Sequence, residues 1–147
     1  MDLISKITED MKIAMKSKDS LALNTIRMLR SEIKNAEIAK KDKLSDDEIV
    51  KVVQTAIKKR KEAAEQYKNA GRDDLYEKEM IEAKTLEKYL PKQLGEDELK
   101  KIIKDVINET NSDNFGLVMK EVMSKVGARA EGKVVNKLVK ELLDVSN

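Results

Sequence analysis

The only proline of the chain, Pro91, stands where the sequence pattern changes. A strongly helical run reaches Leu90, and proline ends such runs because it lacks a backbone N–H and disfavours helix in the residue before it. After Gly95, three acidic residues in a row indicate a new helix, since carboxylates are stabilised at the positive end of the helix dipole. The alternative is a single domain, because prolines also often separate helices within one globule. However, long helical patterns precede this junction and short ones follow it, which favours two domains, residues 1–92 and residues 93–147.

The composition favours an all-α fold. Of the 147 residues, 39% are charged and 40% are hydrophobic, which suits helices that each bury one apolar stripe. Aromatic residues make up only 3%, whereas sheets are enriched in aromatic and β-branched runs. We therefore predict an N-terminal four-helix domain followed by a C-terminal three-helix domain.

Apolar residues at helical spacing place four helices before the junction. The first is expected over about residues 2–16, and the second carries an apolar series over residues 21–38. Residues 45–48 have the spacing of a capping box at the start of the third helix, and Gly71 is its expected left-handed stop. Because the turn before the fourth helix is short, the third and fourth helices should pack as an antiparallel hairpin.

The same spacing predicts three helices after the junction. Their apolar series run over residues 99–107, 115–126 and 134–143, and a polar loop is expected over residues 108–114. Three helices of this size can close a unit of about fifty residues, near the lower limit for independent stability.

Catalytic chemistry has few candidates in this sequence. The chain has no histidine and no cysteine, which removes imidazole bases, thiolate nucleophiles and the usual zinc ligands. Its carboxylates are scattered over expected solvent faces, with no apolar pocket to raise a pKa, and no glycine-rich loop follows a strand. We predict no catalytic residue, no cofactor and no metal. The residues by themselves indicate a helical binding or interaction protein.

The N-terminal residues bear on the location of the protein through what they lack. They show no basic stretch followed by an apolar one, and no apolar run approaches the roughly 18 residues that span a bilayer. We therefore expect a cytoplasmic protein without a membrane partner.

The densest basic run covers residues 58–61, Lys-Lys-Arg-Lys. A run of four covers all sides of a helix, so we interpret it mainly as a solvated face balanced by Glu62 and Glu65. A stripe that faces nucleic-acid phosphates is the alternative.

A second basic stretch, residues 127–133, has a glycine on each side of Arg129 and comes directly before a helix N-terminus. Free N–H groups there, with Arg129 and Lys133 beside them, can seat a phosphate. A plain helix-turn-helix corner explains the glycines equally well. Residues 115–147 hold six basic residues against four acidic ones, so the positive charge of the C-terminal part lies on its last two helices.

Four stretches together resemble the GatB/YqeY family, in which YqeY-like proteins are the stand-alone members. They read TIRMLRSEIKNAE at residues 25–37, QYKNAGRDDL at residues 66–75, EKYLPKQL at residues 87–94 and GARAEGKVVN at residues 127–136. Each is an ordinary helix-turn sequence, but the resemblance covers nearly the whole chain.

The resemblance implies a C-terminal domain similar to the tail of an amidotransferase B subunit. That enzyme converts Asp-tRNA(Asn) or Glu-tRNA(Gln) to the amide with glutamine as nitrogen donor. In that family the tail helps to hold the tRNA, and the chemistry lies in other domains and subunits. The implied function is an accessory tRNA-binding protein. Its family label, carbon–nitrogen ligase activity with glutamine as amido-N-donor, leaves enzymatic activity of this chain undecided.

Carried over to this chain, the tRNA-facing role falls on Lys125, Arg129, Lys133 and Lys137. The implied partners are tRNA and components of an amidotransferase or an aminoacyl-tRNA synthetase. The alternative is a protein-interaction module that reuses the tail fold without binding RNA. The role of the N-terminal domain and the oligomeric state are left open.

Overall fold

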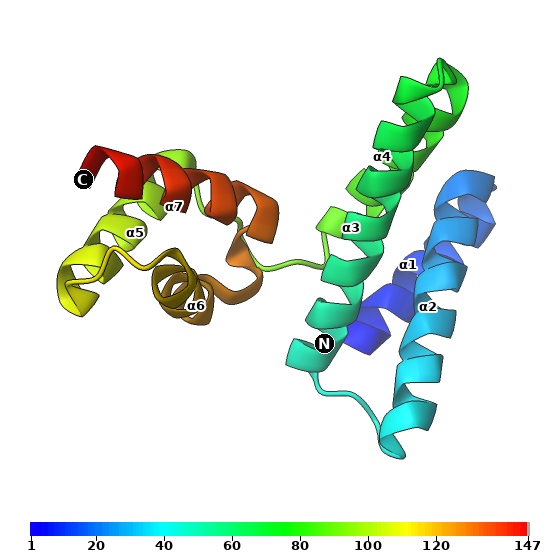
Figure 1. Ribbon diagram of the computed structural model, residues 1–147. Helices are drawn as coiled ribbons and strands as arrows, with labels where there is room; N and C mark the ends of the chain where they lie inside the picture. The colour runs from blue at the N-terminus through cyan, green and yellow to red at the C-terminus, as the bar shows by residue number, and fades with distance from the viewer. Residues whose placement is uncertain (147) are drawn as a thin grey trace. The chain divides into compact units, whose positions relative to one another are not determined.

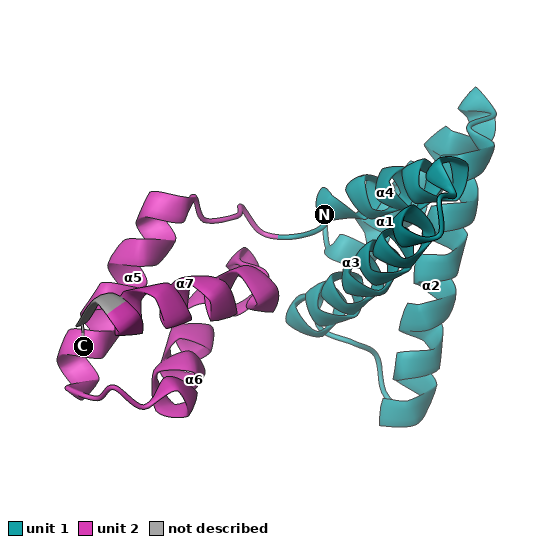
Figure 2. Ribbon diagram, turned by 45° about the horizontal axis from the view of Figure 1, so that its top comes forward, with its two compact units in different colours: residues 1–90 teal, residues 91–147 magenta. Residues whose placement is uncertain are grey.

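The computed structural model describes residues 1–146, and side chains up to residue 144. The described residues form seven α-helices and one 3-10 turn, without a β-strand (Figure 1). The predicted all-α fold class is therefore confirmed. By their internal contacts the residues group into two compact units, Met1–Leu90 and Pro91–Asn147 (Figure 2). That each unit is a domain able to fold alone stays a prediction.

The first unit contains α1 (Leu3–Ser17), α2 (Ser20–Lys40), α3 (Asp46–Asn69) and α4 (Asp73–Glu87). α3 and α4 lie side by side as the expected antiparallel hairpin (Figure 1). Gly71 closes the turn at a φ of +73°, a conformation that glycine adopts without a steric penalty. The backbone N–H of Arg72 donates to the carbonyl of Tyr67 at 2.8 Å across this turn.

One apolar cluster fills the first unit and draws on all four helices: Ile7, Ile26, Leu29, Ile33, Ile49, Val53, Ala56, Ile57, Ala83, Leu86 and Tyr89. The hydroxyl of Tyr89 donates to Oδ2 of Asp10 at 2.7 Å, which joins the segment after α4 to α1. Burial, followed by this bond to a carboxylate, raises the pKa of Tyr89. Helical spacing placed Ile38 on the buried face, but it is 65% exposed because α2 continues beyond Ile33, its last core residue.

The second unit contains α5 (Glu96–Thr110), α6 (Phe115–Val126), the 3-10 turn η1 (Gly127–Arg129) and α7 (Gly132–Ser146). Its core is a separate cluster: Leu99, Ile103, Val106, Val118, Val122, Val126, Ala130, Val135, Leu138, Val139 and Leu143. The loop expected over residues 108–114 is wrong at its start, because α5 continues to Thr110. The hydroxyl of Thr110 donates to the carbonyl of Val106 at 2.8 Å, and Asn111 ends the helix at a left-handed φ of +47°.

The start of α3 has the predicted capping box. The hydroxyl of Ser45 accepts from the backbone N–H of Glu48 at 3.2 Å, and the Glu48 carboxylate accepts from the backbone N–H of Ser45 at 3.1 Å. The same carboxylate accepts from Nζ of Lys40 at 2.6 Å. The bond from Lys40, followed by the bonds at Ser45, lowers the pKa of Glu48 to about 2.

We expect Glu48 to make the stability of the protein pH-dependent. A carboxyl whose pKa is depressed by folding contributes stability above its ordinary pKa of 4.5, and this contribution is lost as the pH falls toward about 2. Glu48→Gln keeps an acceptor for the N–H of Ser45 but removes the charge. Its melting temperature, measured by circular dichroism, should lie below that of the wild type at neutral pH and converge with it in acid. Asp47→Asn removes a charge from the same helical turn and controls for the effect of the helix dipole alone. If the melting temperature of Glu48→Gln stays below that of the wild type in acid, the prediction is wrong.

Candidate nucleic-acid interface

The corner between α6 and α7 carries the predicted phosphate seat. Gly127 ends α6 at a φ of +53°, so a glycine is required there. Gly132 is the first residue of α7, and an added Cβ would meet no atom within 4 Å, so the turn does not require glycine at this position. The backbone N–H of Val135 donates to the carbonyl of Glu131 at 3.0 Å, which makes Glu131 the residue that precedes the helix.

The linker that enters the second unit is bound to this corner. The backbone N–H of Leu94 donates to the carbonyl of Arg129 at 2.8 Å. The side-chain amide of Gln93 donates to the carbonyl of Ala128 at 2.9 Å. Both bonds join the 3-10 turn to the segment that precedes α5. Ala130, directly after this turn, is buried.

Arg129 is exposed, but its guanidinium is engaged within the corner. Nη2 donates to the carbonyl of Lys125 at 2.8 Å, and Nε donates to the carbonyl of Val126 at 3.3 Å. These carbonyls belong to the last turn of α6 and have no hydrogen-bond partner within that α-helix. Arg129 therefore caps α6 and offers only its remaining N–H groups to a ligand.

Lys125 is also exposed and has a partner in the chain. Its Nζ lies 2.9 Å from Oε2 of Glu109, which joins α6 to α5. This hydrogen bond raises the pKa of Lys125, so the side chain stays protonated. The neighbouring carboxylate offsets part of its positive charge.

Lys133 and Lys137 are exposed on consecutive turns of α7. Residues four apart lie on one face of a helix, and Lys140 follows three residues later. The Nζ of Lys140 lies 5.7 Å from the ring centre of Phe115. The buried residues Val135 and Leu138 face the opposite way. The structure thus groups Lys133, Lys137 and Lys140 into one stripe, which we call the α7 basic stripe.

Of the four predicted residues, only Lys133 and Lys137 belong to the α7 basic stripe. The side chain of Lys125 bonds to α5, and the side chain of Arg129 bonds to the last turn of α6. Lys140 was not among the predicted residues, although its spacing from Lys137 places it on the same helical face.

The basic run at residues 58–61 is neither wholly a solvated face nor wholly a stripe that could face nucleic-acid phosphates. Lys58 and Lys59 are exposed, and Lys61 lies 3.8 Å from a carboxylate oxygen of Glu87. Arg60, however, is only 6% exposed. Its Nε lies 3.4 Å from Oε2 of Glu82 on α4. The arginine is therefore part of the packing between α3 and α4 and cannot face a nucleic acid.

Two features are absent from the residues that the structure describes. None of their acidic side chains form a group of three or more that could hold a metal ion. None of their helices is both long and apolar enough to span a bilayer.

Comparison with known proteins gives a match across both units. A family model described as "Yqey-like protein" matches residues 4–143. A Pyrenophora tritici-repentis protein named "Altered inheritance of mitochondria protein 41, mitochondrial" is 33% identical over 147 residues, which cover 96% of this chain and 81% of that protein. Proteins of the same name from Kluyveromyces lactis and Lachancea thermotolerans are 33% and 31% identical. These matches cover 86% and 88% of this chain, and 70% and 71% of the two relatives.

These names correct the expected location. The sequence pattern predicted a cytoplasmic protein, whereas the relatives are named as mitochondrial proteins. The expectation rested on the lack of a secretory signal and of a membrane-spanning run. Neither feature distinguishes the cytoplasm from the interior of an organelle, and the comparison contradicts the cytoplasmic assignment.

Proposed function

The chain belongs to the YqeY-like protein family, and from this premise we propose that it is an accessory protein whose second unit holds tRNA. The α7 basic stripe is the observation that carries the proposal. Its lysines are exposed on successive turns, about 6 Å apart along the axis for residues four apart, so several of them can contact one phosphate backbone. The basic corner before α7 extends this surface toward the N-terminus of the helix.

The mode of binding follows from the side chains present. The second unit has a single aromatic residue, Phe115, which packs against its core, so bases have few platforms on which to stack. Lysine contacts to phosphates do not depend on base sequence. The proposed recognition is therefore of the shape and backbone of a folded RNA.

In this proposal the chain assists a glutamine-dependent tRNA amidotransferase and does not carry out the amidation. General acid–base work requires a group of suitable pKa held within reach of a substrate. The α7 basic stripe contains lysines only, and the chain has neither histidine nor cysteine. The carbon–nitrogen ligase label then belongs to the larger enzyme, and its components are the proposed protein partners together with an aminoacyl-tRNA synthetase.

A protein-interaction module is the second candidate, and two observations favour it. Lys125 and Arg129 are both engaged within the chain, which reduces the charge that the corner offers to RNA. The apolar side chains of Leu117 and Val134 are 43% and 45% exposed, and a partner that covered them would remove this apolar surface from water.

Binding of tRNA by a Lys133→Ala, Lys137→Ala double variant separates the two candidates. We expect weaker binding of every tRNA species tested, because phosphate contacts are lost, and a salt dependence whose slope is smaller by about one unit for each lost contact. Arg129→Ala is unsuitable because it also removes two bonds that cap α6. Affinity should be measured by fluorescence anisotropy over a series of salt concentrations.

The matched control is Lys101→Ala, Lys104→Ala, which removes two exposed lysines from α5 of the same unit. It should bind tRNA as the wild type does. If both double variants retain the affinity and the salt slope of the wild type, the interaction-module candidate stands instead.

A further inference from the structure

A row of cations lies on α2 of the first unit, apart from the proposed RNA interface. Arg27, Arg30 and Lys34 are three and four residues apart, which places them on one face of the helix. We call these three residues the α2 basic stripe. Arg27 and Lys34 are exposed, and Arg30 is partly buried. The stripe spans about 10 Å along the helix axis.

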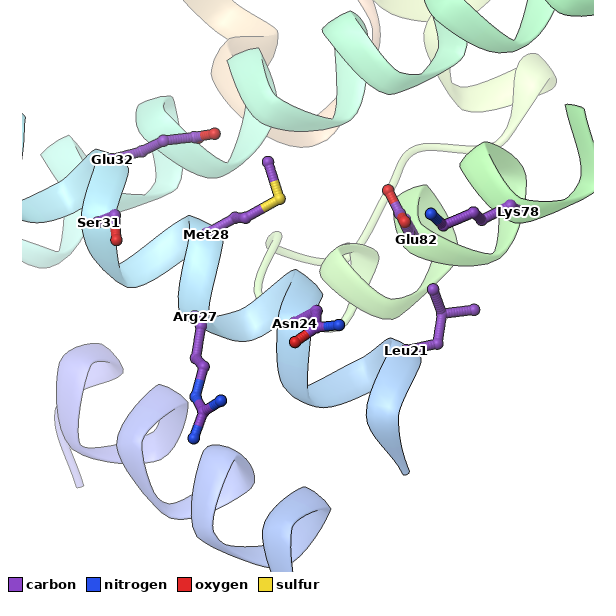
Figure 3. Close-up of a pocket in the computed structure, with 8 residues that line it drawn as sticks. All are labelled: Leu21, Asn24, Arg27, Met28, Ser31, Glu32, Lys78 and Glu82. Atoms are coloured by element: carbon purple, nitrogen blue, oxygen red, sulfur yellow. The ribbon is translucent and has the colours of Figure 1, made fainter. Parts of the chain in front are cut away.

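The stripe lies on the side of α2 that meets α1. Nη1 of Arg30 lies 3.1 Å from the sulfur of Met11 on α1. On another side of α2, Met28 and Glu32 line a groove of about 590 Å³ that α4 also lines (Figure 3). Arg27 lies at the edge of this groove, and its guanidinium is directed toward α1 (Figure 3). The stripe therefore faces a different direction from the groove.

The two arginines of the stripe have no oxygen partner in the described part of the chain. The other three arginines each have one. Arg27 has neither a hydrogen bond nor an ion pair among the described residues, and Arg30 has only the thioether of Met11, which is a weak acceptor. Lys34 has no ion pair with a described carboxylate either. The donors of the stripe are therefore available to a partner.

The carboxylates of α2 are directed elsewhere. The helix contains two, Glu32 and Glu37. Glu32 lines the groove, and Glu37 accepts from the backbone N–H of Leu44 at 3.1 Å, in the loop that follows α2. On α1, Glu9 is two residues from Met11 and does not share the face that meets the stripe. The stripe is thus a local concentration of positive charge on a chain whose formal net charge is only +2.

A phosphate backbone is the partner whose charge complements this row. Phosphates follow one another along a strand, and a guanidinium can bind phosphate oxygens through two parallel N–H bonds. Three cations in a row on one helix can therefore contact one strand. A membrane surface is also anionic, but binding there depends on a broad apolar face beside the cations. Ile38, one turn beyond Lys34, is exposed but does not make such a face by itself.

We propose that the α2 basic stripe is a second surface for the phosphate backbone of a folded RNA. The choice of RNA rests on the proposed function, in which the second unit holds tRNA. The stripe gives the first unit a part in the same binding, with Arg27 and Lys34 in contact with phosphates. These contacts release counterions from the RNA, so they add to the salt dependence of binding.

The double variant Arg27→Ala, Lys34→Ala tests the proposal in the full chain. Both side chains are exposed and neither has an ion pair in the described part of the chain, so the melting temperature should not change. We expect the affinity for tRNA to fall on the order of tenfold at low salt. The slope of the salt dependence should decrease by about one unit for each lost contact. Arg27→Lys, Lys34→Arg keeps both charges and should keep the slope of the wild type.

The matched control is Lys58→Ala, Lys59→Ala, which removes two exposed lysines from α3 of the same unit. Glu62 lies within about one helical turn of both. This variant should keep the affinity and the salt slope of the wild type. Equal losses in the two double variants would mean that any positive charge of the first unit contributes, and would overturn the assignment to α2.

Comparison with Lys133→Ala, Lys137→Ala separates this inference from the proposed function. If only the α7 double variant weakens binding, the inference is wrong and the proposed function stands. If only the α2 double variant weakens binding, the inference stands and the α7 interface is wrong. If the wild type binds no tRNA, both are wrong.

NMR of the arginine side chains locates the contact. The Nε–H signal of Arg27, assigned with Arg27→Lys, should shift saturably when tRNA is added. Arg72 is exposed but bonded to Asp74, and its signal should stay unchanged as the control within the chain. Vesicles of an anionic phospholipid test the other partner. If they bind the wild type but not Arg27→Ala, Lys34→Ala, while tRNA leaves the Arg27 signal in place, the choice of RNA is overturned.

Discussion

Replacing Arg60 by methionine is expected to lower the free energy of unfolding of the first unit by about 3 to 5 kcal/mol. The side chain of Glu82, of which only 14% is exposed, then keeps a buried negative charge without its partner. The bond from Arg60 to the carbonyl of Ala56 is lost as well. Urea denaturation followed by circular dichroism measures the change.

Two further variants identify the cause. Lys59→Met removes a neighbouring positive charge that is exposed, and surface changes of this kind stay within about 0.5 kcal/mol. The double variant Arg60→Met, Glu82→Gln removes both charges and should recover much of the lost stability, because the unpaired charge is the main cost. If Arg60→Met behaves like Lys59→Met, the burial of this ion pair contributes nothing to folding.

Replacing Ile103 by alanine is expected to unfold the second unit and leave the first unit folded. Ile103 is fully buried in the core of the second unit, and truncation of a buried isoleucine to alanine costs about 2 to 5 kcal/mol. A unit of this size has little stability to lose. The two apolar clusters share no residue, so the first unit should not be affected.

The positions of the tyrosines make this result easy to measure. Tyr67, Tyr76 and Tyr89 all lie in the first unit, so tyrosine fluorescence reports on that unit, whereas circular dichroism reports on both. Ile103→Ala should lose part of the helical signal and keep the thermal transition of the tyrosine signal.

Leu29→Ala, at a fully buried position of the first unit, is the matched control and should shift the tyrosine transition. If Ile103→Ala removes the tyrosine transition together with the helical signal, the chain unfolds as one cooperative body. The prediction of two separate domains would then be wrong.

The helices could be predicted from the sequence because their signals are local. Apolar residues at helical spacing, the capping box at Ser45 and the left-handed stop at Gly71 depend on neighbours within about four residues. The end of α5 was placed too early for the same reason. Thr110 looks like part of a polar loop in the sequence, and its bond to Val106 is visible only in the folded helix.

The candidate site could be predicted in part. The family resemblance named Lys133 and Lys137, and the structure shows that both are exposed on one face of α7 together with Lys140. The engagement of Lys125 could not be foreseen, because Glu109 is sixteen residues away in the chain and reaches it only when α5 packs against α6.

Arg60 shows what only the tertiary structure decided. In the sequence it is one of four consecutive basic residues, and nothing local distinguishes it from Lys59. It is buried because α4 folds back along α3 and brings Glu82 beside it, while α2 brings Met28 over it. The sequence by itself determined which segments are helical, since that depends on short-range spacing and caps. Which charge is buried, and where a groove opens, depends on contacts between segments that are distant in the chain.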